Sequence, residues 1–497
     1  MMTALEPRIQ TLVNILIQEF EEKTGLKGVP TEIKPAWMSP PTLIFRIVNP
    51  TDRYYKILSD IKEIHESDLA EHLQVALLKR KPGEQDSNAE RNMFLRTLSE
   101  SLIVNRYTFQ SDFFLRYIQT ASGAEERIVS DANHIVFGRR GSGKSTLLLY
   151  ALHSLEQQER MSAWVDLQSY SKRKDDGVIA DVLCEILEQF GKRLRGTHRD
   201  LVKSLREPGI SLDFIRRLLP SVKSCIIPRL NECFIFLDDL HVVEQAIQPK
   251  LLDVLYSITR GSRIFIKISS IETLTVTYDS GSKEGMQQHH DIQRLPLDYN
   301  LTKPDLAYKH ITSILDSIAG YCGLFSALKL CTNENVLKRL VWTSAGVPRD
   351  ALSVFSQAMG ESQGSRISVS SINAAVFRLK TTKMVDLEYD TNESSVQLAN
   401  LIEQITKFCF QHGNNSFLVK KNHLLPNIMR LVDLRLLHVI HEDLTPEKAG
   451  EQFIALTLDY GFYVSERKSS RINEFNPNLD TIKTKALREL PKFTVPE

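Results

Sequence analysis

Apolar positions along the chain change their spacing several times, and each change marks a different kind of element. Residues 6–23 and 53–78 carry apolar side chains at helical intervals, and residues 42–48 between them form a strand-like run. Gly and Pro residues separate these stretches and end the first helix. The pattern predicts a small N-terminal α/β domain in residues 1–104, for which a general interaction module is the simplest interpretation.

The middle of the chain, residues 105–300, alternates short apolar runs with longer helical patterns. The runs lie at 134–137, 163–167, 233–237, 263–268 and 292–296. Strands separated by helices imply right-handed crossovers and a parallel sheet that is covered on both faces. We therefore expect an α/β core here.

The pattern changes again after this core. Residues 301–385 are helical throughout, which predicts a helical lid beside the α/β core. Residues 386–480 differ, with two helical stretches followed by strand-like runs at 437–440 and 453–458. This order of helices and then a hairpin is typical of a winged helix. The last residues, 481–497, are expected to form a tail.

Composition adds little to this picture. The chain of 497 residues is 42% hydrophobic and 25% charged, and its net charge of +1 gives no overall attraction to nucleic acid or to a membrane. Six cysteines occur without metal-binding spacing, which fits buried thiols in a reducing compartment. No stretch approaches the ~20 apolar residues of a membrane span, so no membrane contact is expected and the cytoplasm is the expected location.

A glycine-rich loop follows the strand at 134–137. The run Gly138-Arg-Arg-Gly-Ser-Gly-Lys-Ser145 fits G-x-x-x-x-G-K-[ST], the phosphate-binding (P-loop or Walker A) pattern. Its glycines let backbone N–H groups surround phosphates, and the helix that follows adds its positive N-terminal end. We expect ATP to contact Gly138, Arg139, Arg140, Gly141, Ser142, Gly143, Lys144, Ser145 and Thr146. In this pattern Lys144 reaches the β- and γ-phosphates, and Ser145 binds Mg²⁺.

Two carboxylates end the strand at 233–237, in the pattern called Walker B. A buried strand would bring Asp238 and Asp239 to the edge of the sheet beside the phosphate loop. Asp238 is expected to hold Mg²⁺, and Asp239 to orient and activate the attacking water. Similar ATPases mostly have Glu at the second position. The shorter Asp239 therefore fits slow hydrolysis, as in a switch that keeps ATP bound for long periods.

These motifs together resemble the AAA+ and STAND ATPases, which belong to the additional-strand class of P-loop NTPases. The resemblance covers about residues 105–470, and the extra strand near Trp164 carries it along with the two motifs. It implies that a polar residue at the end of the 263–270 strand, Ser269 or Ser270, acts as sensor 1 at the γ-phosphate or the attacking water.

The lid carries a second family element, Ser344-Ala-Gly-Val-Pro-Arg-Asp-Ala-Leu352. It resembles the G-x-P-R element of ATPases of the origin-recognition-complex type (ORC/CDC6), in which the arginine is sensor 2. The resemblance implies that Arg349 reaches from the lid to the nucleotide.

ATPases of that type carry a winged helix after the lid, and it binds DNA. The resemblance therefore implies a recognition helix within residues 423–437, with four basic residues as candidate contacts to phosphates of double-stranded DNA. These are Lys420, Lys421, Arg430 and Arg435. Acids nearly balance bases in this segment, so a protein-contact surface remains an equal alternative.

One expected feature of AAA+ proteins is absent. They usually place an arginine finger after sensor 1, yet residues 271–293 contain no Arg. Arg260, Arg263 and Arg294 are substitutes by position, although a surface charge or a structural ion pair is the simpler interpretation of each. Ring assembly is therefore not required by the sequence, and homo-oligomerisation stays open.

The sequence favours an ATP-binding and hydrolysing AAA+ switch that regulates or loads a partner, on DNA in the leading hypothesis. The alternative is a STAND-like signalling ATPase, for example in phage defence, that oligomerises and acts through a separate effector protein. Stimulation of hydrolysis by DNA would distinguish the first from the second. Intact Lys144, Asp238 and Asp239 argue against a scaffold that holds nucleotide only structurally.

Overall fold

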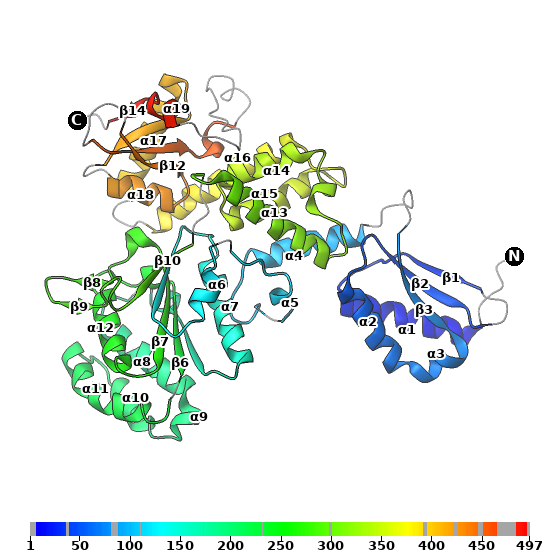
Figure 1. Cartoon of the computed structure of the whole chain (residues 1–497), viewed down its shortest axis with the longest axis horizontal. Helices are drawn as coiled ribbons and strands as arrows, with labels where there is room; N and C mark the ends of the chain where they lie inside the picture. Colours follow the sequence, from blue (N-terminus) through cyan, green and yellow to red (C-terminus); the bar gives the residue numbers. More distant parts are fainter. Residues whose placement is uncertain are drawn as a thin grey trace.

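The structure is a computed structural model of the chain. It describes residues 6–35, 39–80, 88–109, 111–120, 122–171, 173–230, 232–297, 301–390, 395–421, 425–445, 451–464 and 484–494. The helical lid and the C-terminal domain lie next to each other above an α/β core, and an N-terminal α/β unit projects from the lid (Figure 1).

Five of the described strands form the parallel sheet of the core, in the order β10-β4-β7-β6-β5. Their bounds are β4 (His134–Phe137), β5 (Ser162–Asp166), β6 (Cys233–Asp238), β7 (Ile264–Ser270) and β10 (Gln293–Pro296). All five match predicted runs to within two residues. The predicted parallel sheet is confirmed. The extra strand expected near Trp164, β5, lies at the edge of the sheet, and β7 is the strand between β4 and the Walker B strand β6.

Helices cover both faces of this sheet, which explains why its strands are continuous apolar runs. The helices of the core are α5 (Ser111–Phe114), α6 (Ala124–Ile128), α7 (Lys144–Gln157), α8 (Gly177–Gln189), α9 (Gly191–Leu194), α10 (Arg199–Leu205), α11 (Leu212–Ile226) and α12 (Gln248–Thr259). One buried apolar cluster joins α8, α11 and α12 to one side of the sheet, and a second joins α6 and α7 to the other. A short hairpin of β8 (Tyr278–Asp279) and β9 (Glu284–Gly285) packs on α12.

The lid is helical, as predicted. It consists of α13 (Pro304–Tyr321), α14 (Glu334–Ser344), α15 (Pro348–Glu361) and α16 (Val369–Asp390). Helix α15 begins with Pro348 at its first position, where a missing N–H leaves no hydrogen bond unmade. The preceding helix ends at Ser344, and the next residue, Ala345, adopts the left-handed conformation with φ 48°. The turn between α14 and α15 thereby brings the start of α15 to the core.

The N-terminal unit contains α1 (Pro7–Thr24), β1 (Thr31–Lys34), β2 (Thr42–Ile47), α2 (Asp52–Ile64), α3 (Glu66–His72) and β3 (Gln74–Lys79). The predicted helix over 53–78 is wrong at its end, because β3 pairs in parallel with β2. Helix α4 (Ala89–Ser101) continues from this unit and packs on α13 and α15. The Tyr54 hydroxyl donates a 2.8 Å hydrogen bond to the carbonyl of Tyr321, so the unit is attached to the lid.

The C-terminal domain contains α17 (Ser395–His412), β11 (Ser416–Lys420), α18 (Leu425–Asp433), β12 (Leu437–Leu444), β13 (Phe453–Leu458), α19 (Thr484–Arg488) and β14 (Lys492–Phe493). Its strands lie in the order β12-β13-β11-β14, with β12 and β13 forming the predicted antiparallel hairpin. β14 pairs in parallel with β11, so the segment predicted as a tail adds a strand to this sheet.

The described residues bear on the expectations for the cysteines and for membrane-spanning helices. All six cysteines are free and buried. In the described part of the chain, no helix combines the length and the apolar character needed to cross a membrane.

Candidate functional site

The phosphate loop runs from β4 into α7 and has the tight backbone that its glycines permit. Gly141 and Gly143 adopt φ of 75° and 96°, in the left-handed region that favours glycine. At Gly141, a Cβ would lie only 2.7 Å from the Cβ of Arg349 in the lid. The absence of a side chain at this position therefore lets the lid approach the loop.

Lys144 is buried at the centre of the loop. Its ammonium group donates hydrogen bonds to the carbonyls of Gly138 (3.0 Å) and Arg139 (3.1 Å). Burial lowers the pKa of Lys144, and the nearby carboxylates of Asp239 and Asp238 oppose this shift. The cation is thus held inside the loop, where an entering phosphate could replace these carbonyls.

The Walker B carboxylates meet this loop as predicted. Asp238 accepts hydrogen bonds from the hydroxyls of Ser145 (3.0 Å) and Ser269 (2.5 Å). Burial and the neighbouring charge of Asp239 raise the pKa of Asp238 to about 7, against the hydrogen bonds from Ser269 and Ser145. A hydroxyl and a carboxylate at this spacing form an oxygen donor set of the kind that Mg²⁺ uses together with nucleotide phosphates. Ser145 and Asp238 therefore fit a Mg²⁺ ion.

Asp239 projects into the cavity beside the loop. It has φ 59°, and its backbone N–H donates a 2.8 Å hydrogen bond to the Ser269 hydroxyl. Ser269 therefore contacts the carboxylate of Asp238 and the backbone of Asp239, which places the first sensor 1 candidate at the Walker B pair. Ser270 does not enter the site, because its buried hydroxyl bonds to Thr275.

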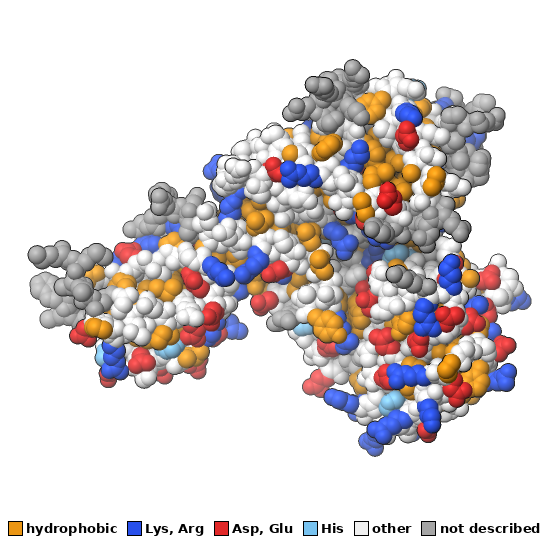
Figure 2. Space-filling view, turned by 180° about the vertical axis from the view of Figure 1, so that it is seen from behind, with side chains coloured by type: hydrophobic (Ala, Val, Ile, Leu, Met, Phe, Trp, Pro, Cys, Tyr) orange, Lys and Arg blue, Asp and Glu red, His pale blue; other side chains and the backbone are white. Residues whose placement is uncertain are grey.

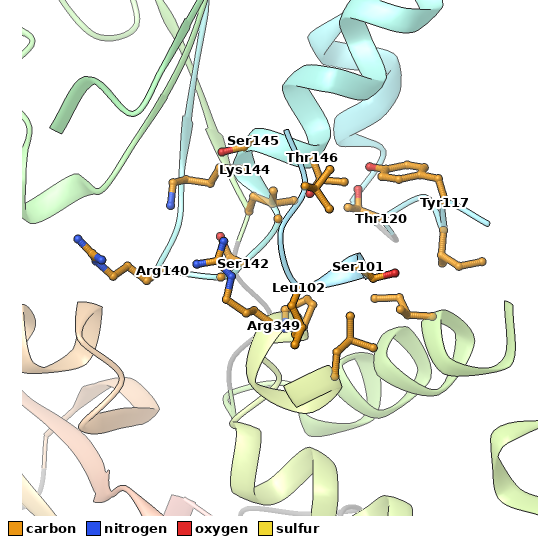
Figure 3. A pocket seen from close by; sticks show the side chains of 18 of the residues that line it. Ser101, Leu102, Tyr117, Thr120, Arg140, Ser142, Lys144, Ser145, Thr146 and Arg349 are labelled. Carbon is orange, nitrogen blue, oxygen red and sulfur yellow. The ribbon is translucent and has the colours of Figure 1, made fainter. Parts of the chain in front are cut away.

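A cavity of about 330 Å³ lies between the core and the lid and contains the phosphate loop (Figure 3). That volume is within the range of small-molecule sites, roughly 300–1,000 Å³. Besides Arg140 to Thr146 of the loop, it is lined by the segment before β4, by α13 and by α15. The lining residues include Tyr117, Ile118, Thr120, His310, Ile314 and Ile318, none of which the sequence motifs identified.

His241 is another lining residue that sequence reasoning missed. It follows the Walker B pair, and its Nδ1 lies 3.8 Å from an Asp239 carboxylate oxygen. Burial lowers the pKa of His241 to about 3, against the effect of Asp239. The ring is therefore neutral beside the acid that faces the cavity.

Arg349 lies at the start of α15, where the lid meets the loop. Its backbone N–H donates a 3.2 Å hydrogen bond to the carbonyl of Gly141, and its side chain lines the cavity. Burial lowers the pKa of Arg349, and the nearby charge of Arg435 adds to this. Figure 3 shows Arg349 next to Ser142, so the lid contributes a cation at the phosphate end of the cavity.

Arg139 behaves differently from the other residues of the loop. Its side chain is buried away from the cavity and donates to the carbonyl of Ala345 (3.1 Å) and to Nδ1 of His438 (3.3 Å). The side chain of Arg139, expected to contact ATP, instead connects the loop to the lid and to the C-terminal domain. Only its backbone is available to a phosphate in this conformation.

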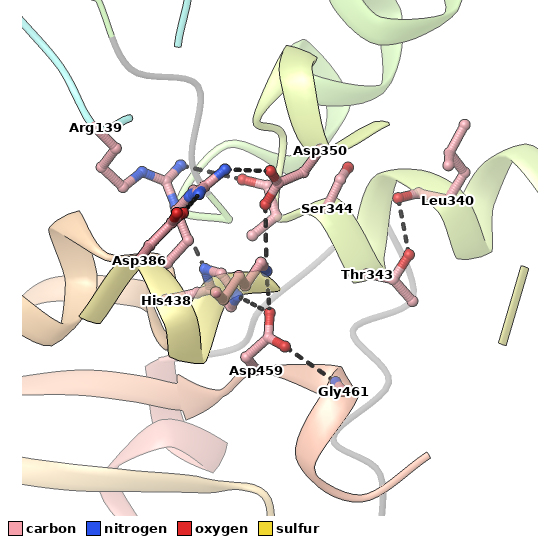
Figure 4. Close-up of polar contacts among 12 residues, drawn as sticks. Arg139, Leu340, Thr343, Ser344, Asp350, Asp386, His438, Asp459 and Gly461 are labelled. Carbon is pink, nitrogen blue, oxygen red and sulfur yellow. Dashed lines mark hydrogen bonds and ion pairs between the residues drawn. The ribbon is translucent and has the colours of Figure 1, made fainter. Parts of the chain in front are cut away.

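His438 belongs to a buried polar network that connects the phosphate loop, the lid and the C-terminal domain (Figure 4). Its Nε2 lies 2.9 Å from a carboxylate oxygen of Asp459, which also contacts Lys383 of α16 at 2.6 Å. Burial lowers the pKa of His438 despite Asp459, so the ring is neutral. A neutral imidazole with its proton on Nε2 donates to Asp459 and accepts at Nδ1 from the guanidinium of Arg139. The two contacts of His438 fit this arrangement.

Asp350 continues the network beside Arg349. It pairs with Lys383 at 3.2 Å and with Arg435, which also pairs with Asp386 at 2.8 Å. Burial would raise the pKa of Asp350, but Arg435 and Lys383 hold it below its usual value. Three cations and three carboxylates therefore balance around the neutral His438. The network links the phosphate loop, the lid and the C-terminal domain.

The four basic residues proposed to contact DNA phosphates are mostly engaged within the protein. Arg435 is 5% exposed and belongs to the buried network, so its prediction as a phosphate contact is wrong. Lys420 pairs with Glu451 at 2.9 Å, and Lys421 pairs with Asp443. Arg430 lines a small cavity between α18 and the core. Helix α18 itself contacts the core, where Thr273 bonds to Asp433.

The substitutes for an arginine finger are also engaged. Arg263 pairs with Glu232, and Arg294 pairs with Glu272. Arg260 packs over the ring of Tyr256. The interpretation of Arg263 and Arg294 as structural ion pairs is therefore confirmed.

No protein-family model matches the chain, and no curated protein matches it. Similar solved structures include the Walker-type ATPase of Pyrococcus abyssi, at 11% identity and TM-score 0.42, covering 70% of this chain and 99% of that one. Drosophila ORC bound to DNA is similar at 12% identity and TM-score 0.37, covering 82% and 99%. The Aeropyrum pernix ORC1 protein in complex with DNA is similar at 15% identity and TM-score 0.37, covering 74% and 98%.

These likenesses concern the fold alone. The chemistry of the site follows from its own local geometry, in which the phosphate loop, the Walker B strand and the start of α15 meet.

Proposed function

We propose that the chain binds and hydrolyses ATP as an AAA+ switch that regulates or loads a partner on DNA. The observation that carries the proposal is a cavity with two sides. The core supplies Lys144, Ser145 and the Walker B acids, and the lid supplies Arg349. A nucleotide bound between them would hold the lid against the core.

Each residue has a role that derives from its position. Lys144 and Arg349 bind the terminal phosphates and stabilise the negative charge that develops on them during hydrolysis. Ser145 and Asp238 hold Mg²⁺, which neutralises phosphate charge when it is bound. Asp239 orients the attacking water and accepts its proton. Ser269 donates to the carboxylate of Asp238 and accepts from the backbone N–H of Asp239, so it holds the two residues in place.

The buried network explains how the nucleotide state would reach the rest of the molecule. Arg349 and Asp350 are consecutive residues at the start of α15, and Asp350 is bonded through Lys383 to Asp459 of the C-terminal domain. A movement of Arg349 toward phosphate would change the position of Asp350. We therefore propose that the C-terminal domain, a winged helix in this proposal, moves with the lid.

The rival function is a STAND-like signalling ATPase that acts through an effector protein. The docking of α18 on the core and the paired lysines of the C-terminal domain favour a protein-contact role for that domain. This rival predicts ATP-dependent self-association without DNA.

Steady-state hydrolysis with and without a duplex of about 30 base pairs distinguishes the two. The leading proposal expects a several-fold rise in turnover with DNA. A rate unaffected by DNA, combined with ATP-dependent oligomers in sedimentation, would replace it with the signalling function.

A further inference from the structure

A basic helical segment closes the end of the core farthest from the lid. Helices α9, α10 and α11 lie between α8 and β6, at the lower end of the core in Figure 1. Residues 191–229 contain ten Lys or Arg and three Asp or Glu, an excess of seven positive charges. The whole chain has a net charge of only +1, so this segment is set apart from the remainder, which is negative overall.

Part of this charge is exposed at the lower end of the core, where Figure 2 shows Lys and Arg side chains among Asp and Glu side chains. Leu194, Val202 and Leu205 are buried and hold α9 and α10 on the core. Arg199 and Lys203 are exposed, and because they are four residues apart they lie on the same side of α10. Helix geometry separates them by about 6 Å along the axis. They therefore form a short basic row that points to solvent.

The basic row is not neutralised by the protein. In the described part of the chain, Arg199 and Lys203 have no carboxylate within ion-pair distance, and the same holds for the exposed Lys192 and Arg195. Arg206, next along the row, is the exception and pairs with Glu188 at 2.7 Å. This contrasts with the C-terminal domain, whose lysines at 420 and 421 are both paired.

We propose that this basic face of α9 and α10, rather than the C-terminal domain, binds the phosphate backbone of duplex DNA. The inference rests on the proposed function, since it identifies the surface by which the switch would contact DNA. The unpaired cations match the charge of a phosphate backbone, and binding of this kind is independent of base sequence.

The composition of the face favours a duplex over other anionic partners. Single-stranded nucleic acid is bound by exposed aromatic side chains as well as by charge. Phe214 is the only Phe, Tyr or Trp in residues 191–229, and it is partly buried. A helix that lies in a membrane surface presents apolar side chains beside its basic ones. Ile227 is the only large apolar residue of this segment among those that are strongly exposed in the described structure.

The test is fluorescence anisotropy of a labelled duplex of about 30 base pairs, titrated with the full chain at several salt concentrations. The variant Arg199→Gln/Lys203→Gln removes two unpaired charges. The matched control, Lys420→Gln/Lys421→Gln, removes two paired charges from the C-terminal domain. Circular dichroism and melting temperature establish that both variants are folded, and basal ATPase is expected to be unchanged in both.

We expect the variant at 199 and 203 to bind DNA on the order of 60-fold more weakly at 0.1 M salt, since two released counterions contribute about this factor. The slope of log affinity against log salt should fall by about 2. The control should keep the affinity of the wild type.

The remaining outcomes overturn the inference in distinguishable ways. Wild-type binding that survives in the first variant and is lost in the control would assign DNA to the C-terminal domain and leave the proposed function intact. No binding of DNA by the wild type would overturn both the inference and the DNA-associated function. Tighter binding of polyglutamate than of DNA, lost in the first variant, would assign the face to an acidic protein.

Discussion

Replacement of Lys383 by Met tests whether the buried network holds the lid and the C-terminal domain together. Lys383 is 1% exposed and lies 2.6 Å from Asp459 and 3.2 Å from Asp350. The substitution removes the cation that joins two buried carboxylates while it keeps most of the side-chain volume. Removal of one partner from a buried ion pair costs about 3–5 kcal/mol, because the remaining charge stays buried without compensation.

This cost can be converted to a melting temperature. A cooperative unit of roughly 150–250 residues loses about 2–4 °C per kcal/mol, so the transition of the lid and C-terminal domain should fall by about 6–20 °C. Differential scanning calorimetry at pH 7.5 measures it. Lys420→Met is the matched control, because Lys420 is 49% exposed and its pair with Glu451 contributes only about 0–1 kcal/mol.

A double variant tests whether uncompensated buried charge causes the loss of stability. Lys383→Met/Asp459→Asn removes one charge of each sign, so it should recover part of the lost stability. Equal melting temperatures for Lys383→Met and Lys420→Met would refute the reasoning, because they would show that the carboxylates at 350 and 459 are not dependent on this cation. A double variant less stable than the single one would refute the assignment of charge repulsion as the cause.

Three further changes test individual residues of the site. Asp239→Asn should lower turnover about 100-fold or more and leave ATP affinity unchanged, since a general base contributes roughly 10²–10⁴-fold; unchanged single-turnover hydrolysis would contradict its role. Arg349→Ala should weaken ATP binding in titration calorimetry by roughly 10- to 150-fold, the loss of one charged hydrogen bond, and equal affinity would exclude Arg349 from phosphate contact. Burial lowers the pKa of His310 to about 4, against Glu125, so below pH 6.5 the unfolded chain binds a proton that the folded chain does not. Stability should therefore fall between pH 6.5 and 4 by up to about 1.4 kcal/mol per unit, and urea unfolding at pH 7.5 and 5 should show a smaller fall in His310→Gln.

Local patterns predicted the parts of the molecule whose chemistry is local. The five core strands were recognisable because strands buried on both faces are continuous apolar runs. The phosphate loop was recognisable because the positions of Gly141, Gly143 and Lys144 are dictated by the backbone that surrounds phosphate. The strand at 74–79 was missed because Val75, Leu77 and Leu78 fit a helical pattern as well as a strand pattern.

Features that depend on tertiary contact left no such pattern. Tyr117 and His310 line the same cavity but lie far apart in sequence, and neither belongs to a motif. Arg139 was grouped with the phosphate loop by position, yet its side chain turns to His438, about three hundred residues later in the chain. Only the packing of the lid and the C-terminal domain on the core determines which way this side chain points.

Phosphate release from ATP in the presence and absence of Mg²⁺, by the wild type and by Lys144→Ala, tests the central claim most directly. We expect Mg²⁺-dependent turnover by the wild type and loss of that turnover in the variant, with the melting temperature of the variant preserved. Equal phosphate release by both proteins, or no ATP binding by the wild type, would contradict the assignment of the cavity at Lys144 as an ATPase site.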